Sequence, residues 1–536
     1  MKKLFSDEKI EKYHYLIVGL IFALACAVRV IGIDWGLPDS NLHPDEGIIF
    51  GQAYQCALDR SFEVREYYRP NHVTIKLVTL LYTALQDVFF SSRGLDDFAT
   101  NFAFHTTAFL TASRLLIALF GIGVVFFAYL IGRIFGKKQG LMAALLFAIF
   151  PAFIEHSHYI TPDIPLLFFL MGVLWAGLKY HKKQSITWIF WMSFFTALAT
   201  CEKYPGIYGS IIIAAAIIIS RYKKPIYILR DGALAVLFLV IGVMAISPVL
   251  IIDHETVWEV LKGQNASHHL GADGLNFPQT LWYYLKTTGV HIGLLLSLFS
   301  IYGVVKSIKK DAKRTLILLS FFMYWIPISA LKVHWERYTL PLYAFGLIMA
   351  SMGICYFSEG FVEKLEKKKM FLTIKNGLVA LSVISLFMGS VAMDARFLSP
   401  DSRVYTVDKL AELGVGRGNS VYDCSTPLDY GGYYGAFANF VDGNAEEYKY
   451  GPLPQFIVTS SSQRDLYLIS DQEYYGGVAN FYRQVDDIYR LIYIYTPENP
   501  KPCFIEIYNI GYATKNVIRY ARGAANGFEI RVYQTY

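Results

Sequence analysis

Apolar segments long enough to cross a lipid bilayer recur along this chain from its N-terminus to about Val391. A helix needs roughly 20 apolar residues to cross a hydrocarbon core about 30 Å thick. Hydrophobic residues make up 54% of the 536 residues, which is too apolar for an ordinary soluble protein. The pattern therefore predicts a polytopic α-helical membrane protein.

Eleven of these segments are predicted to span the membrane. They are residues 14–33, 112–135, 140–156, 162–180, 186–201, 205–220, 228–251, 285–305, 314–331, 338–357 and 371–391. The first follows Lys2, Lys3, Lys9 and Lys12 and no small-residue cleavage site comes after it, so we interpret it as a retained helix. The spans end near Met393, which divides the chain into a membrane domain, residues 1–393, and a C-terminal region, residues 394–536.

Clusters of lysine and arginine between the predicted spans indicate their orientation. The clusters are Arg133/Lys137/Lys138, Lys179/Lys182/Lys183, Arg221/Lys223/Lys224, Lys306/Lys309/Lys310/Lys313/Arg314 and Lys364/Lys367/Lys368/Lys369. Because short cytoplasmic loops carry an excess of basic residues, we expect all five clusters and the N-terminus in the cytoplasm of a prokaryote, with the protein in its plasma membrane. The basic charge is spread over short turns and is not a nucleic-acid footprint, so no nucleic-acid partner is expected.

The first outer loop, residues 34–111, contains one further apolar stretch at residues 73–90. Counting this stretch as a span would reverse every later loop and put all five basic clusters outside. It is interrupted by Thr74, Lys76, Thr79, Thr83, Gln86 and Asp87. Such interruptions fit a helix that lies along the membrane surface better than a lipid-exposed span. We therefore expect interfacial helices in this loop.

Acidic residues and histidines gather in the predicted outer loops. Asp45 and Glu46 are adjacent carboxylates that suit proton abstraction or metal binding, although either could instead cap the helix that starts near Gly47. The second outer loop contains Glu155, His156, His158 and Asp163 within nine residues. Its His-x-His pattern could ligate a divalent ion, but such a pattern is more often a solvated turn.

Three basic residues are predicted at the same outer interface. Lys203 follows a span, Arg114 lies just inside the start of another, and Arg337 sits between two long apolar helices. An arginine there could clamp a phosphate through its planar fork of donors. The alternative is that these cations extend toward the interface from helix ends, or pair with acids beside an aromatic anchor.

At this point the residues resemble a known group, the GT-C fold glycosyltransferases of the protein O-mannosyltransferase and aminoarabinose (lipid A) transferase type. The resemblance rests on Pro44-Asp45-Glu46, Ser113-Arg114-Leu115-Leu116, Gly132-Arg133-Ile134-Phe135-Gly136, Tyr159-Ile160-Thr161-Pro162-Asp163 and Glu336-Arg337-Tyr338-Thr339-Leu340-Pro341. These segments follow the family's order, and the resemblance covers most of the chain. One departure is that Lys76 is followed by Leu77 and Val78, where members often have Lys-Pro-Pro.

The resemblance implies transfer of one sugar from a dolichyl- or undecaprenyl-phosphate donor to an acceptor on the outer face, with inversion at the anomeric carbon. It makes Asp45 the base, with Glu46 assisting by orientation. The residues expected to bind the lipid phosphate or the sugar are Arg337, Lys203, Arg114, Asp163, Lys76, Glu336, Tyr338 and His334. No cofactor is certain; if a divalent metal ion is used, Asp45 and Asp163 are the first candidate ligands, followed by His156 and His158. The acceptor can be a protein, a lipid or a glycan.

The C-terminal region has a soluble-like composition. We predict a helix at residues 404–413 and strands at 456–459, 491–495, 504–508 and 528–533, in a small extracytoplasmic α/β domain. By analogy with bacterial members of the family, this domain would recognise the acceptor. Cys424 and Cys503 both fall in it and could form a disulfide in an oxidising compartment, or never meet.

Two other classes of protein compete with this interpretation. A transporter or flippase of a lipid-linked or anionic substrate would also place charges in membrane helices. Here the charges fall in outer loops, and the sequence shows no inverted repeat. A receptor or assembly factor would need fewer crossings than eleven to anchor the C-terminal domain.

Overall fold

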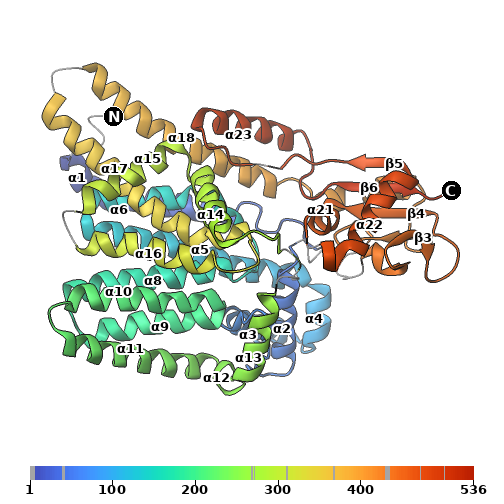
Figure 1. The fold of residues 1–536 in the computed structure, drawn as a ribbon, viewed down its shortest axis with the longest axis horizontal. Coiled ribbons are helices and arrows are strands. Elements are labelled where there is room, and N and C mark those ends of the chain that lie inside the picture. The colour runs from blue at the N-terminus through green and yellow to red at the C-terminus, as the bar shows by residue number, and fades with distance from the viewer. Residues whose placement is uncertain are drawn as a thin grey trace.

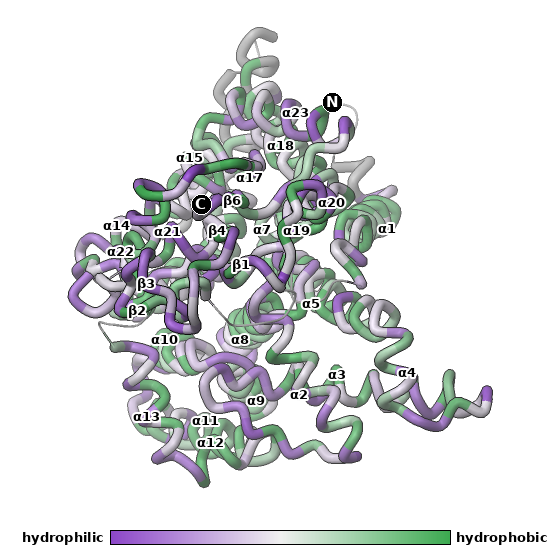
Figure 2. The backbone as a smooth tube through the Cα atoms, turned by 90° about the vertical axis from the view of Figure 1, so that its right-hand side faces the viewer, coloured by the Kyte–Doolittle hydropathy of each residue, from purple (hydrophilic) through white to green (hydrophobic). Residues whose placement is uncertain are grey.

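The computed structural model describes residues 7–38, 43–266, 270, 272–308, 312–365, 369–428, 435–470, 472–499 and 501–536. Long helices run side by side to form a bundle, and a smaller unit of strands and helices lies beyond one end of it (Figure 1). Figure 2 looks onto that end, with the strands in front of the bundle helices. The architecture is the helical membrane protein with a small C-terminal α/β domain that the sequence predicts.

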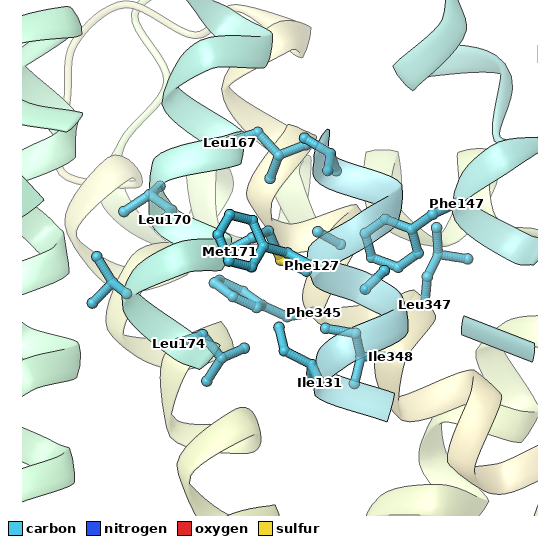
Figure 3. Close-up of a cluster of buried hydrophobic side chains, with 14 of the residues drawn as sticks. Phe127, Ile131, Phe147, Leu167, Leu170, Met171, Leu174, Phe345, Leu347 and Ile348 are labelled. Carbon is cyan, nitrogen blue, oxygen red and sulfur yellow. The ribbon is translucent and has the colours of Figure 1, made fainter. Parts of the chain in front are cut away.

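The bundle helices correspond to the predicted spans. They are α1 (Asp7–Val30), α5 (Thr106–Phe135), α6 (Lys137–Ala148), α8 (Asp163–Lys182), α9 (Ile186–Glu202), α10 (Gly209–Arg221), α11 (Pro225–Ile246), α15 (Leu294–Ile308), α16 (Ala312–Ile328), α17 (Leu340–Leu365) and α18 (Lys369–Phe397). Shorter helices join them: α2 (Glu46–Leu58), α3 (His72–Ala84), α4 (Phe98–Phe104), α7 (Pro151–His156), α12 (Val249–Ile252), α13 (His254–Gln264) and α14 (Phe277–Ile292). Large apolar side chains fill the space where α5, α6, α8 and α17 meet, among them Phe127, Phe147, Met171 and Phe345 (Figure 3).

The predicted number of eleven crossings is not confirmed. Among the described residues, eight helices are long and apolar enough to cross a membrane, or nine if the bent pair α14 and α15 is one span. Helix α6 has only 12 residues, and α9 and α16 have 17 each. One of the eight is His72–Arg93, the stretch that we expected at the membrane surface. Lys2, Lys3, Lys309, Lys310, Lys367 and Lys368, which belong to the predicted orientation signal, lie outside the described residues.

Helix α3 lies across the ends of several bundle helices. Its Thr74 hydrogen bonds to Glu202 at the end of α9, and the Lys76 ammonium donates to the Ile246 carbonyl at the end of α11, at 2.5 Å. One or two turns later, Tyr82 accepts a 3.0 Å hydrogen bond from Ser113, near the start of α5. A helix that touches the same-side ends of three neighbours supports an interfacial arrangement, although its length and apolarity would also allow a span. We call this end of the bundle, where α9 and α11 end and α5 begins, the cluster end.

Two predicted spans are broken. A distant residue, Arg29 at the first break and Glu506 at the second, contacts free backbone groups there. Residues 140–156 form α6 and α7, because the chain turns before Pro151. The buried Arg29 guanidinium donates to the free carbonyls of Phe147 and Ala148, at 3.1 and 3.0 Å. Residues 285–305 are bent by 110° between α14 and α15, at Gly293, where the backbone has a φ of +88°.

The C-terminal unit contains a four-stranded sheet in the order β1-β4-β6-β5. Its strands are β1 (Ser420–Tyr422), β4 (Phe456–Ser460), β5 (Arg490–Tyr495) and β6 (Ile530–Gln534), and a separate hairpin joins β2 (Phe440–Val441) to β3 (Asn444–Tyr448). Strand β1 runs parallel to β4, and the other pairs are antiparallel. The helices are α19 (Ser402–Tyr405), α20 (Val407–Glu412), α21 (Ser461–Ile469), α22 (Gln472–Ile488) and α23 (Glu506–Ala521).

The strand predicted at residues 504–508 is wrong. Glu506 begins α23, whose buried residues Glu506, Ala513, Asn516 and Tyr520 recur at helical spacing. The short apolar run at the start of this helix has the length and composition of a strand, and only the residues beyond it reveal the helical period. Cys424 and Cys503 are not joined in the structure.

Candidate functional site

Asp45 lies between two arginines at the cluster end. It occupies the N-cap position of α2, yet its side chain makes no capping hydrogen bond. Instead, one carboxylate oxygen contacts Arg69, and the other is 2.8 Å from a guanidinium nitrogen of Arg337. The carboxylate is nearly buried, with 9% of its side chain exposed. Asp45 is therefore held as an anion by two cations from separate loops, and the helix-cap alternative does not describe it.

A second ion pair joins the start of α8 to the end of α9. Asp163 is the first residue of α8, and Lys203 directly follows the last residue of α9. The Lys203 ammonium is 2.6 Å from one Asp163 oxygen and 4.9 Å from the centre of the Tyr338 ring. The two side chains come together because α8 starts and α9 ends at the same end of the bundle.

Together these five residues, Asp45, Arg69, Asp163, Lys203 and Arg337, form what we call the charge cluster. The positive charges of Arg337 and Arg69 both act on Lys203, so the two pairs belong to one electrostatic unit. Three cations against two carboxylates leave one net positive charge in a mostly buried setting. A group with this balance can accept one further anion, such as a phosphate, with little rearrangement.

Lys203 has an altered proton affinity. Burial of the ammonium group lowers its pKa to about 8, and the contact with Asp163 opposes this effect only in part. The neighbouring charge of Arg337 acts in the same direction as burial. The net charge of the cluster therefore changes within the range of pH in which an enzyme can be assayed.

Two adjoining cavities share part of their lining, and Arg337 lines the smaller one. The smaller one, with a volume of about 280 Å³, is lined by Ala152, Glu155, His156, Trp335, Glu336, Arg337, Leu340 and Tyr343. The larger one, about 520 Å³, shares Ala152, Glu155 and Glu336 with it and extends between α14, α18 and α23. In this wall Glu155 pairs with Arg396 at 2.6 Å, and Glu336 pairs with His291 at 2.7 Å. The charge cluster thus has space beside it for a substrate of moderate size.

Glu46 and Arg114 are not part of this open region. They form a two-pronged ion pair, with both contacts at 2.9 Å and with 2% and 1% of their side chains exposed. Arg114 also donates to the Ile33 and Trp35 carbonyls, and Glu46 accepts from the Ile160 amide. Every one of these contacts joins segments of the fold. In the structure the polar groups of Glu46 and Arg114 are thus engaged with each other and with the backbone, and both side chains are buried.

The other residues expected to contact the donor fall into two groups. Some lie at a cavity or at the charge cluster, and others make contacts within the fold. Glu336 lines both cavities, and Tyr338 lies beneath the Lys203 ammonium. Lys76 donates to the Ile246 carbonyl at the end of α11. His334 is held between Asp273, at 2.8 Å, and the Leu331 carbonyl, also at 2.8 Å, and only 1% of its side chain is exposed.

The side chains expected to bind a metal ion do not fit one in this arrangement. Both oxygens of Asp45 and one oxygen of Asp163 contact cations. Both ring nitrogens of His158 face backbone carbonyls, at 2.8 and 2.9 Å, and the ring stacks on Phe397. His156 alone faces a cavity. Across the part of the chain that the structure describes, no three His, Cys, Asp or Glu side chains converge on a possible ion.

Arg69 is the member of the charge cluster that the sequence did not reveal. It lies in the first outer loop between Tyr68 and Pro70, in a stretch without helical or strand period. The available signal was its location, since the predicted topology puts it on the same side as Asp45. Nothing in the sequence distinguished it from Arg60 and Arg65 of the same loop.

Comparisons with known proteins agree with this architecture. Residues 103–252 match the family model described as dolichyl-phosphate-mannose-protein mannosyltransferase. The solved structure of the oligosaccharyltransferase AglB from Archaeoglobus fulgidus, in complex with an inhibitory peptide and a dolichol-phosphate, aligns with a TM-score of 0.53 at 11% identity, over 98% of this chain and 89% of that chain. ArnT from Cupriavidus metallidurans, bound to undecaprenyl phosphate, aligns with a TM-score of 0.48 at 16% identity, over 74% and 72%.

A search among curated proteins gave no match. The matched family segment contains Asp163 and Lys203 of the charge cluster and helices α5 to α12. The likeness to AglB extends over nearly the whole chain and establishes the fold. The chain is therefore a helical membrane protein with the GT-C fold, and its residues 103–252 match the dolichyl-phosphate-mannose-protein mannosyltransferase family.

Proposed function

We propose that this chain is a membrane glycosyltransferase that moves a single sugar from a polyprenyl-phosphate donor to an acceptor hydroxyl. The observation that carries the proposal is the charge cluster, in which Asp45 lies between two arginines and one of them, Arg337, lines a cavity. The family match supports transfer of a sugar from a lipid phosphate. The dolichol-phosphate in the AglB structure supports the same class of donor.

The cluster can serve both ends of an inverting displacement. The acceptor oxygen attacks the anomeric carbon, its proton passes to Asp45, and the bond from that carbon to the phosphate oxygen breaks. The departing oxygen keeps the bonding electrons, and Arg337 and Lys203 stabilise the negative charge that develops on it. Inversion follows because the acceptor and the leaving phosphate lie on opposite sides of the sugar.

Arg337 can couple donor binding to the base. In the structure one of its guanidinium nitrogens contacts Asp45. A donor phosphate would compete for this arginine, since its oxygens match the guanidinium fork. Once Arg337 turns to the phosphate, Asp45 is left with Arg69 alone and becomes a better proton acceptor. The base would then be activated by the arrival of the donor.

The class of activity is tested by turnover in lipid nanodiscs. The purified protein is incubated with a panel of polyprenyl-phosphate monosaccharides and a mixed extract of acceptors, and release of the lipid phosphate is measured. Turnover of one donor is the expected result. If no donor reacts in any acceptor mixture, the proposal fails, and transport of a lipid-linked or anionic substrate becomes the better description.

Arg337→Lys is expected to lower kcat/KM for the donor by about 10- to 100-fold. Lysine keeps one positive charge but loses the planar fork, which is worth roughly 1.5–3 kcal/mol in charge-assisted contacts. The measurement is steady-state turnover over a range of donor concentrations. Arg65→Lys is the matched control, because Arg65 also pairs with an acid, Glu63, yet is 72% exposed. Equal loss in both variants would contradict the role of Arg337.

The pH dependence of donor use is expected to report Lys203. As the pH rises through about 8, the ammonium loses its proton, the cluster loses its net positive charge, and the KM for the donor rises. Lys203→Arg keeps its charge to much higher pH, so the rise should disappear or move above pH 10 or so. The measurement is KM from about pH 6 to pH 10. An unchanged profile in Lys203→Arg would assign the inflection to another group.

A further inference from the structure

Helix α23 belongs to the C-terminal region but lies beside a membrane helix. It packs along α18 (Figure 1), and the Asn509 side chain donates to the Ser385 carbonyl and hydroxyl, at 3.2 and 2.9 Å. Ser385 lies inside the candidate membrane span Asn376–Phe397. It is 12 residues before the end of α18, a distance of about 18 Å along the helix. The first turns of α23 therefore lie beside the interior of this candidate span and not beside its end.

The start of α23 is fixed at this depth by the break between α14 and α15. The Phe504 carbonyl accepts a 2.7 Å hydrogen bond from the Leu294 amide. The Glu506 carboxylate accepts a 2.6 Å hydrogen bond from the Leu295 amide, and only 4% of this glutamate is exposed. Both contacts satisfy free amides at the start of α15. The depth of α23 is thus set by specific polar contacts and not by loose packing.

The free face of α23 changes in character along its length. Phe504, Ile505, Ile507 and Tyr508 are 39%, 42%, 66% and 67% exposed. Apart from the buried Glu506, the charged residues of α23 come later, at Lys515 and Arg519, and Arg522 directly follows the helix. An apolar face at the deep end followed by charges toward the cluster end is the order expected for a helix that emerges from a bilayer. A soluble domain would not leave such a contiguous apolar patch facing water.

The neighbouring surface of α18 has the same character. Ile384 and Phe387 are 49% and 39% exposed within the candidate span. Ser385, which Asn509 of α23 contacts, lies between these two residues in the sequence of α18. We propose that residues 504–511 are embedded in the membrane leaflet at the cluster end, with lipid acyl chains as the partner of this face. The C-terminal region then re-enters the membrane and does not lie wholly outside it.

This placement gives the larger cavity a wall that touches lipid. Asn509, Tyr512 and Ala513 of α23 line that cavity together with residues of α14 and α18. Lys501, just before α23, and Lys286 of α14 also line it, so the cavity has charged groups in its lining. A helix with lipid on one side and a polar cavity on the other is an arrangement in which charges near membrane depth are tolerated.

Photocrosslinking in nanodiscs tests the proposal. The photoreactive residue p-benzoylphenylalanine replaces Tyr508 in the full-length protein, and lipid adducts on the chain are measured by mass spectrometry after irradiation. Tyr474 is the matched control, because it is a tyrosine of the C-terminal unit with 62% exposure, close to the 67% of Tyr508. Leu229 is the positive control, since it is 71% exposed within the candidate span Pro225–Ile246.

The yield of lipid adduct at position 508 is expected to match that at position 229 and to exceed that at position 474 about tenfold, since only a chain embedded in the acyl region meets lipid continuously. A yield at position 508 no higher than at position 474, while position 229 reacts, would overturn the proposal. A crosslink from position 508 to a second copy of the chain would also overturn it, because a protein would then cover the face. The same substitution at Ile507 repeats the test if the Tyr508 variant does not fold.

Discussion

Sugar transfer by Asp45→Asn should be at least about two orders of magnitude slower than by the wild type, whichever acceptor is used. Asparagine keeps the shape of the side chain but cannot take up the acceptor proton. It also cannot balance Arg69 and Arg337, which contact the carboxylate on its two sides. The measurement is single-turnover release of lipid phosphate with a saturating donor, so that the chemical step and not donor binding is compared.

The control for Asp45→Asn is Asp87→Asn. Asp87 lies in the same predicted outer loop and also pairs with an arginine, Arg60, at 2.7 Å, but both side chains are about half exposed. An unchanged rate for Asp87→Asn shows that the loss of an ion pair in this loop does not explain the effect. Equal rates for wild type and Asp45→Asn, with the protein folded, would place the base elsewhere and leave Asp45 a purely structural partner of the arginines.

Arg114→Met should lower the free energy of unfolding by about 3–5 kcal/mol, because it leaves the Glu46 carboxylate buried without its counter-charge. This ion pair is almost wholly excluded from solvent and joins α2, α5, the end of α1 and the loop before α8. The measurement is thermal or denaturant unfolding in a fixed detergent. The double variant Glu46→Leu/Arg114→Met should recover much of the loss, since it removes both charges.

The exposed pair of Glu11 and Lys137 provides the comparison for Arg114. Their side chains are 61% and 33% exposed, so Lys137→Met should change stability by no more than about 1 kcal/mol. The two possible roles of Arg114 give different results. A stable Arg114→Met protein that had lost donor affinity would return Arg114 to the lipid-phosphate site, against the contacts that the structure shows.

The helices of the bundle could be predicted from the sequence, but their breaks could not. Apolar length and basic clusters locate each span because the bilayer imposes both signals on the chain itself. The breaks after α6 and before α15 depend on Arg29 and Glu506, which supply hydrogen bonds from distant positions. A local pattern contains no information about such partners, so residues 140–156 and 285–305 each read as one continuous span.

The candidate site could likewise be predicted only in part, because topology groups loops but does not determine side-chain contacts. Asp45, Asp163, Lys203 and Arg337 could be grouped from the sequence because the predicted topology sends their loops to one end of the bundle. Glu46 and Arg114 were grouped with them for the same reason. Their burial in a mutual ion pair depends on which side chain faces which, and topology alone does not determine that. Arg69 was missed because a basic residue in a long loop has no periodic context.

The hydrogen bond between Glu506 and Leu295 joins residues that are 211 positions apart in the chain. At the usual speeds of translation, roughly 10 to 40 s separate the synthesis of these two residues. During this interval the first turn of α15 lacks the acceptor that it has in the finished protein. The bend between α14 and α15, and the cavity wall beside it, can therefore be completed only after the ribosome has reached Glu506.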